Sequence, residues 1–151
     1  MFKRFEQFST IISAISRHIQ KIERDEMEKY GYKGAFAQYL LTFLRYPQGC
    51  TAAQLCEICD KDKAAVSRII SEMEVKGLVQ RHGTNNRLYN ACITLTENGK
   101  TAADFVRRKA TAAVNAVGNE MTDEERSTFY SNLESIAAKL QSISRNGIPE
   151  E

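Results

Sequence analysis

The stretch TAAQLCEICDKDKAAVSRIISEMEVKGLVQRHGTNNRLYNACITL, residues 51–95, decides the fold of this chain. Thr51 and Gln54 stand at the spacing of a capping box, which predicts that a short helix begins there. Asp62 predicts the N-cap of a second, longer helix, because its carboxylate can accept from the unpartnered amides of the first turn. Gly77 predicts the end of that helix. The stretch therefore begins with two helices joined by a tight turn.

A hairpin is expected directly after the second helix. Residues 78–82 and 87–95 have the composition of two strands, and the turn residues Gly83–Asn86 lie between them. Apolar and polar side chains alternate along the second strand with the period of a half-buried strand. Helix, turn, helix and hairpin follow one another in the order of a winged helix-turn-helix.

The second helix has two contrasting faces. Its apolar side chains fall at helical spacing and are expected to face a core; they are Val66, Ile69, Ile70 and Met73, extended by Val75 and Leu78. The opposite face carries small side chains, two cations and no acid: Lys63, Ala64, Ser67, Arg68 and Ser71. Such a face suits a major groove, because small residues allow close approach and an arginine can bond guanine through two donors. An ordinary solvated helix surface is the alternative.

Four short runs resemble the MarR family of bacterial transcriptional regulators. They are Leu55–Glu57 (LCE), Asp62–Arg68 (DKAAVSR), Lys76–Val79 (KGLV) and Leu95–Gly99 (LTENG). The resemblance covers nearly the whole chain and implies a winged-helix dimer that binds pseudopalindromic DNA. It also implies release of that DNA when a small ligand binds or a thiol is oxidised. Carried over residue by residue, it places six residues on the DNA-facing side of the second helix: Lys63, Ala64, Ala65, Ser67, Arg68 and Ser71.

The chain departs from the family pattern at three places. Ala64 and Ala65 stand where members often have Ser or Thr, so fewer phosphate contacts are expected there. Asp60 and Lys61 occupy the turn between the two helices, where many members have Gly and an apolar residue. The wing lacks the usual Asp two residues before an Arg, which removes an internal salt bridge from the neighbourhood of Arg87.

Two arginines of the hairpin are also expected to bind DNA. Arg81 lies on the first strand, and Arg87 lies at the tip, from which an arginine can enter an A·T-rich minor groove. An ordinary hairpin arginine is the alternative for Arg87. The charge distribution favours binding, because residues 61–90 hold six basic and three acidic side chains, whereas residues 91–151 hold seven basic and nine acidic ones.

The length and composition describe an ordinary folded chain. Its 151 residues fit one compact domain, or one domain with an oligomerisation arm, and its net charge is +2. The sequence contains no apolar run of about 18 residues and no basic leader before a short apolar block. A cytoplasmic protein without a membrane partner is therefore expected.

Apolar side chains repeat at heptad-like spacing near both ends of the chain. The N-terminal seam consists of Phe5, Phe8, Ile12, Ile15, Ile19 and Ile22. The C-terminal seam consists of Phe129, Leu133, Ile136, Leu140 and Ile143. Such seams need partner helices, which a second copy of the chain would supply. The second helix of each helix-turn-helix, the expected recognition helix, would then lie about 34–36 Å from its mate, which is one turn of duplex DNA. A homodimer is expected, and a helix pair within one chain is the alternative.

The expected fold class is mainly α with a small β wing. A winged helix-turn-helix core is joined to a helical dimerisation region formed by the N- and C-terminal helices. The expected parts are a dimerisation helix over 1–34, the DNA-binding domain over 35–96, dimerisation helices over 97–146 and a tail over 147–151. Thr96 is expected to cap the helix that begins at residue 97.

The resemblance further implies an effector pocket between the dimerisation helices and the winged helix. His18, Tyr39 and Phe43 are candidates to line it, since they combine aromatic walls with polar groups, although such residues are more often core. Cys56 and Cys59 form a C-x-x-C motif and are candidates for redox chemistry. The better interpretation of Cys59 is a buried small hydrophobe, because the resemblance puts a core Leu there.

No metal, cofactor or catalytic site is expected. The C-x-x-C motif has neither a thioredoxin-like strand before it nor a second pair at zinc-finger spacing. The sequence has no Gly-rich phosphate loop and no Ser/His/Asp set. The expected function is a sequence-specific, ligand-responsive repressor that acts as a homodimer; the alternative is a winged-helix module for protein interaction or thiol sensing.

Overall fold

The computed structural model describes residues 2–83 and 91–149. The described chain is mostly helical with one small antiparallel sheet, which confirms the expected fold class. It divides into two compact units, residues 1–111 and 112–151. The first unit holds α1 to α4, both strands and the first part of α5 (Glu97–Gly118), and the second unit holds the end of α5 and α6 (Asp123–Asn146).

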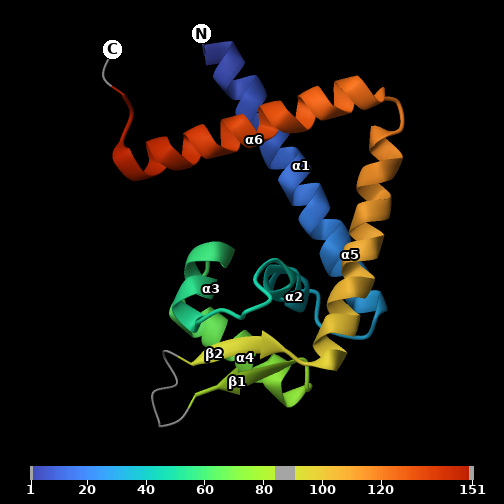
Figure 1. Cartoon of the computed structure of the whole chain (residues 1–151), viewed down its shortest axis with the longest axis vertical. Coiled ribbons are helices and arrows are strands. Elements are labelled where there is room, and N and C mark those ends of the chain that lie inside the picture. The colour runs from blue at the N-terminus through green and yellow to red at the C-terminus, as the bar shows by residue number, and fades with distance from the viewer. Residues whose placement is uncertain (1, 84–90, 150–151) are drawn as a thin grey trace. The chain divides into compact units, whose positions relative to one another are not determined.

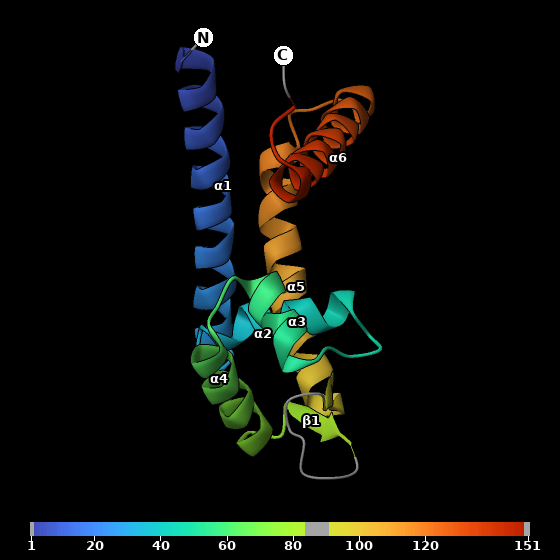
Figure 2. The same ribbon diagram turned by 90° about the vertical axis from the view of Figure 1, so that its left-hand side faces the viewer.

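The first unit is a winged helix preceded by a long helix. Its elements are α1 (Phe2–Lys29), α2 (Phe36–Arg45), α3 (Ala52–Cys59), α4 (Lys63–Val75), β1 (Val79–His82) and β2 (Cys92–Leu95). Helix α2 contacts both α1 and β2, and it lies between α1 and the sheet (Figure 1). Figure 2 shows α4 beside β1, and these two elements are also in contact. The helix-turn-helix pair α3 and α4 is therefore held against α2 and the sheet.

The helix starts follow the predicted capping chemistry. The Thr51 and Gln54 side chains form a capping box at α3, and the Asp62 carboxylate accepts from the Ala65 amide at α4. Thr96 accepts from the Gly99 amide through its hydroxyl at the start of α5. These caps satisfy first-turn amides that would otherwise lack partners, so each helix starts where its cap stands.

The two described strands form an antiparallel pair, and the second strand has an additional partner. Strand β1 pairs with β2 in the register Val79 to Leu95 and His82 to Cys92. The tip of the hairpin, including Arg87, lies outside the described residues. Cys50, just before α3, forms an isolated antiparallel bridge with Ile93, which the sequence pattern did not indicate. The bridge fixes the start of α3 against the sheet.

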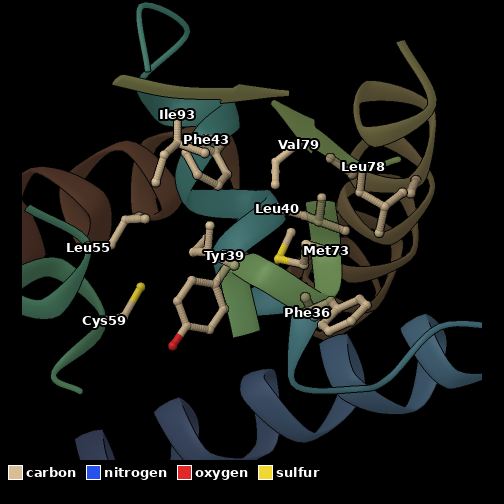
Figure 3. Close-up of a cluster of buried hydrophobic side chains, with 14 of the residues drawn as sticks. Phe36, Tyr39, Leu40, Phe43, Leu55, Cys59, Met73, Leu78, Val79 and Ile93 are labelled. Carbon is tan, nitrogen blue, oxygen red and sulfur yellow. The ribbon is translucent and has the colours of Figure 1, made fainter. Parts of the chain in front are cut away.

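One hydrophobic core joins α1, α2, α3, α4, the sheet and the start of α5. Figure 3 shows side chains from α2, α3, α4 and the sheet meeting around Leu40, which is fully buried; α1 adds Met27 to this core, and α5 adds Val106. Most of the predicted α4 stripe lies there, since Val66, Ile70 and Met73 are buried and Ile69 is packed at the edge. Burial of such side chains is worth about 1.5–3 kcal/mol each, so the core fixes the inner face of α4.

One apolar residue predicted to face the core does not. Val75 is 87 % exposed, because it is two residues after Met73 and so points to the other side of α4. The apolar stripe of α4 is therefore narrower than the sequence pattern predicted. On α3, Ile58 is also exposed, and the helix packs inward through Leu55 and Cys59.

The turn between α3 and α4 depends on a left-handed aspartate. Asp60 has φ 51° and ψ 53°, and it is the one non-glycine residue with positive φ in the described chain. The Lys61 amide donates to the Cys56 carbonyl at 3.1 Å, which closes the end of α3 as a Schellman motif. Asp tolerates this conformation better than most residues, though less well than Gly.

Replacing Asp60 with glycine is expected to stabilise the protein. The left-handed conformation costs an L-residue about 1 kcal/mol, so Asp60→Gly should gain about 0.5–1 kcal/mol in the free energy of unfolding. Asp60→Ala should lose stability for the same reason. Urea denaturation of the three proteins measures both changes, and a glycine variant less stable than the alanine variant would contradict this account.

Candidate nucleic-acid interface

The outer face of α4, defined as Lys63, Ala64, Ser67, Arg68 and Ser71, is exposed along its whole length. It lies opposite Val66, Ile70 and Met73, which are buried, so the core presents this face to solvent. The Arg68 side chain has no hydrogen bond or ion pair with any residue in 2–83 or 91–149. The face thus offers an exposed guanidinium, two hydroxyls and close backbone approach on one helix.

Ala65 differs from the other predicted DNA-binding residues. It is half-buried and lines a cavity behind the helix, and its amide donates to Asp62 at 2.8 Å. Its side chain therefore lies at the border between the outer face and the interior. The prediction of a DNA contact at Ala65 remains untested.

The acidic side chains of α4 pair with cations from neighbouring segments. Glu72 pairs with Lys33, and Glu74 pairs with Arg81 at 3.0 Å. Neither acid is among the five residues of the outer face, although Glu74 lies one turn after Ser71. The electrostatic character that the sequence predicted for this face is present in the folded chain.

The helix and the wing are joined by a tight junction. Gly77, with φ +70°, ends the turn after α4, and its carbonyl accepts from the Thr96 hydroxyl at 2.5 Å. The Thr96 amide donates to the Leu78 carbonyl at 3.0 Å. The start of α5 therefore fixes the point at which the chain leaves α4 and enters β1.

A cavity of about 220 Å³ lies behind the helix-turn-helix and is lined by α1, α2, the α3–α4 turn and α4. Its polar side chains are Gln20, Glu23, Arg24, Gln38 and Lys61, and its apolar wall includes Tyr39 and Ile69. Tyr39 is 3 % exposed, and its hydroxyl points out of the core cluster toward α1 (Figure 3). None of the side-chain hydrogen bonds of the described residues involves that hydroxyl, and it is not a fully buried atom, so it is open to the cavity.

Charge and protonation in this cavity follow from burial. Burial raises the pKa of Tyr39 to about 12, so its hydroxyl keeps its proton at neutral pH. Burial also raises the pKa of Glu23, against the opposing effect of Arg45 and Arg24. The cavity therefore presents a neutral hydrogen-bond donor beside charged groups of both signs.

The three effector candidates from the sequence do not meet in one place. Tyr39 lines the cavity behind α4, whereas Phe43 lines a separate hollow between α2, the sheet and α5, and His18 is exposed on α1. Residues 39 and 43 are one helical turn apart, but neighbouring elements cover them differently. Sequence reasoning missed Glu23, Arg24 and Lys61, because exposed charge patterns on helices carry no signal of a cavity.

The cysteines behave as interior residues more than as a reactive pair. Cys59 is buried, and its burial raises the pKa of the thiol. The Thr42 hydroxyl lies 3.8 Å from the Cys59 sulfur. A raised pKa reduces the thiolate that reacts with oxidants or metals, so the burial of Cys59 favours a packing role. Cys56 is half-buried.

The described chain contains neither a metal-binding cluster nor a helix able to span a membrane. Residues 2–83 and 91–149 contain no group of three or more His, Cys, Asp or Glu side chains that could hold a metal ion. Among the helices of the same segments, none is both long and apolar enough to cross a bilayer.

Comparison with known proteins finds similarity to one family of regulators. Residues 30–87 match the model of the MarR family. The chain is 24% identical over 102 residues to YwhA of Bacillus subtilis, an uncharacterized HTH-type transcriptional regulator, and the match covers 68% of this chain and 70% of that protein.

Solved structures share the fold. A MarR transcriptional regulator from Methanosarcina mazei Go1 has a TM-score of 0.78 and 22% identity, covering 91% of this chain and 99% of that chain. A mutant of MarR from E. coli complexed with operator DNA has a TM-score of 0.65 and 16% identity, covering 90% of this chain and 97% of that chain. Residues 30–87 therefore resemble the MarR family, and the chain shares the fold of these solved structures.

Proposed function

We propose that this protein is a homodimeric, sequence-specific regulator that binds duplex DNA through the outer face of α4. The observation that carries the proposal is the exposed face of small residues, hydroxyls and cations opposite a buried stripe. Arg68 lies in the middle of that face and is placed to bond a guanine edge through two donors. Lys63, Ser67 and Ser71 would contact phosphates or base edges beside it.

Replacing Arg68 with alanine tests the role of this face. If Arg68 makes a bidentate base contact, Arg68→Ala should cost about 1–3 kcal/mol of specific binding and relax the preference at one base position. DNA fragments selected from the genome of the source organism supply the probe, and fluorescence anisotropy measures the affinity. Arg68→Lys keeps the charge but loses the planar fork, so it separates base recognition from phosphate attraction.

Lys109 provides a matched control for this experiment. It is an exposed cation on α5, and its ammonium lies 5.7 Å from the Phe105 ring centroid. Lys109→Ala removes the same charge away from α4 and should leave binding nearly unchanged. Equal affinities for Arg68→Ala and the parent protein would remove Arg68 from the interface.

The homodimer is supported by the exposed seam on α1. Phe5 is 69% exposed and Ile15 is 47% exposed in the single chain, and both belong to the heptad-like pattern. An apolar stripe of this length is unfavourable in water and suits a partner helix of the same kind. We assign a second copy as that partner, because a two-fold pair would present two α4 helices to one pseudopalindromic site.

The rival function is a winged-helix module that binds proteins and not DNA. Ala64 and Ala65 favour it, since they replace residues that contact phosphate in similar proteins. A salt titration separates the two functions. Neutralisation of several phosphates gives a steep, linear fall of log affinity with log salt, whereas a protein-binding module shows no saturable DNA binding.

The cavity behind α4 is the proposed effector site. An occupant would touch α1, Tyr39 of α2, Lys61 of the turn and Ile69 of α4, so its binding would bias the placement of the helix-turn-helix. The unpartnered Tyr39 hydroxyl supports a ligand with a hydrogen-bond acceptor. We assign the protein as a repressor whose ligand weakens DNA binding, which a transcription assay with and without a bound ligand would test.

Replacing Tyr39 with phenylalanine should change ligand binding without changing stability. The hydroxyl is open to the cavity and makes none of the side-chain hydrogen bonds of the described residues, so its loss should alter the free energy of unfolding by about 0.5 kcal/mol or less. Thermal-shift screening of small organic acids, phenols and amines should find compounds that stabilise the parent and not Tyr39→Phe. A loss of about 1.5 kcal/mol in the variant alone would instead mean that the hydroxyl has a structural partner.

A further inference from the structure

Three side chains connect the recognition helix to the wing. The Arg81 guanidinium donates through Nε to the Glu74 carboxylate at 3.0 Å and through Nη2 to the Ser71 hydroxyl at 3.4 Å. The Arg81 side chain is 19% exposed, compared with 64% for Lys33 in the other α4 ion pair. Two hydrogen bonds and partial burial therefore fix the Arg81 side chain, in contrast to the exposed Lys33.

The position of Arg81 explains this arrangement. On β1 it pairs with Ile93, which is buried, so its side chain leaves the sheet on the side that faces the protein. Glu74 lies in the last turn of α4, and Ser71 lies one turn earlier on the same helix. One guanidinium thus spans two turns of α4 from the first strand of the wing.

We propose that Glu74 and Arg81 are positioning residues that set the angle between the recognition helix and the wing. The proposal rests on the proposed DNA-binding function. It assigns Arg81 a role inside the protein, where the sequence pattern predicted a direct DNA contact. Ser71 belongs to the outer face of α4, so the same guanidinium also orients a hydroxyl that the proposed function places at the DNA.

For a variant that lacks the Glu74 carboxylate, the proposal predicts a change in DNA affinity opposite in sign to the change that charge alone would cause. Removing the negative charge of Glu74 near a polyanion would by Coulomb attraction alone strengthen DNA binding. If Glu74 holds Arg81 and thereby the wing, its removal weakens specific binding instead. Glu72 is the matched control, because it lies on the same helix and carries the same charge, and its pair with Lys33 is more exposed.

The first experiment needs no DNA. Hydrogen exchange of the β1–β2 amides reports how firmly the wing is held, and alanine suits both positions because it favours helix. Glu74→Ala should speed exchange in residues 79–82 and 92–95 by about three- to fivefold, the range expected for loss of a partly buried ion pair. Glu72→Ala should leave these rates unchanged. Equal exchange rates in Glu74→Ala and the parent would overturn the proposal.

The second experiment measures binding to the selected DNA at one salt concentration. Glu74→Ala should weaken binding by about three- to tenfold, while Glu72→Ala should bind as well as the parent or more tightly. Arg81→Lys keeps the charge but cannot reach both partners, so it should weaken binding as Glu74→Ala does. Parent-like binding by Arg81→Lys, or tighter binding by Glu74→Ala, would contradict the positioning role.

The two experiments separate this inference from the proposed function. If the parent protein bound no DNA, the proposed function would fail, and the exchange rates would still decide whether Glu74 and Arg81 hold the wing. If the parent bound DNA, and Glu72→Ala and Glu74→Ala bound it equally weakly, the loss of affinity would not depend on Arg81. The inference would then be wrong although the proposed function stood.

Discussion

The double substitution Ile12→Glu and Ile15→Glu is expected to make the protein monomeric. It should also weaken binding to a DNA with two half-sites by at least about a hundredfold. Both residues lie on the exposed seam of α1, where a partner helix would bury them. Two carboxylates facing their symmetry mates would add like-charge repulsion to the loss of apolar contact. The second half-site would then be bound only from solution, without the high effective concentration that a dimer provides.

Size-exclusion chromatography with light scattering measures the mass, and anisotropy on full and half sites measures the affinity. Thr10→Glu is the control, because residue 10 is exposed and lies on the opposite side of α1 from the seam. This variant should remain a dimer with the affinity of the parent. A double variant that remained dimeric would show that α1 does not form the interface, and a monomeric parent would remove the homodimer itself.

The parts of the fold that could be predicted are those set by local chemistry. Thr51, Asp62 and Thr96 begin helices because each side chain bonds amides within three residues of itself, so no distant contact is needed. The outer face of α4 was predictable for a similar reason, since helical spacing alone separates it from Val66 and Ile70. Residues close together in the sequence predict which side of a helix is exposed, but they do not predict what packs against it.

What could not be predicted depends on segments far apart in the sequence. The bridge between Cys50 and Ile93 joins residues 43 positions apart, and the cavity behind α4 combines charges from α1 with an apolar wall from α4. The sequence pattern predicts Arg81 as a DNA contact because it is a basic residue on the first strand of the expected wing. The sequence alone contained no sign that Glu74 would reach it, because the turn at Gly77 brings the two together.

Among the glycines of the described chain, Gly99 leaves the least room for a side chain. It lies in the first turn of α5 and is buried, and a Cβ atom there would be 1.9 Å from the Leu78 carbonyl oxygen and 3.1 Å from the Leu95 side chain. That carbonyl is a backbone group which accepts from the Thr96 amide, so it cannot rotate away as a flexible side chain would. The start of α5 approaches β1 this closely because residue 99 has no side chain.

Replacing Gly99 with alanine should therefore destabilise the protein by about 3 kcal/mol, at the upper end of the usual cost of overpacking. The expected fall in Tm is about 6–12 °C for a chain of this size, measured by calorimetry at fixed protein concentration. Gly118→Ala is the matched control, because it is in the same helix with nothing within 4 Å of a Cβ, and it should gain about 0.5 kcal/mol. Since Leu78 begins the wing directly after α4, any Gly99→Ala protein that remains folded should also bind DNA more weakly than the parent. A Gly99→Ala protein as stable as the parent would mean that α5 can move away from β1 without loss, and the junction would not fix the wing.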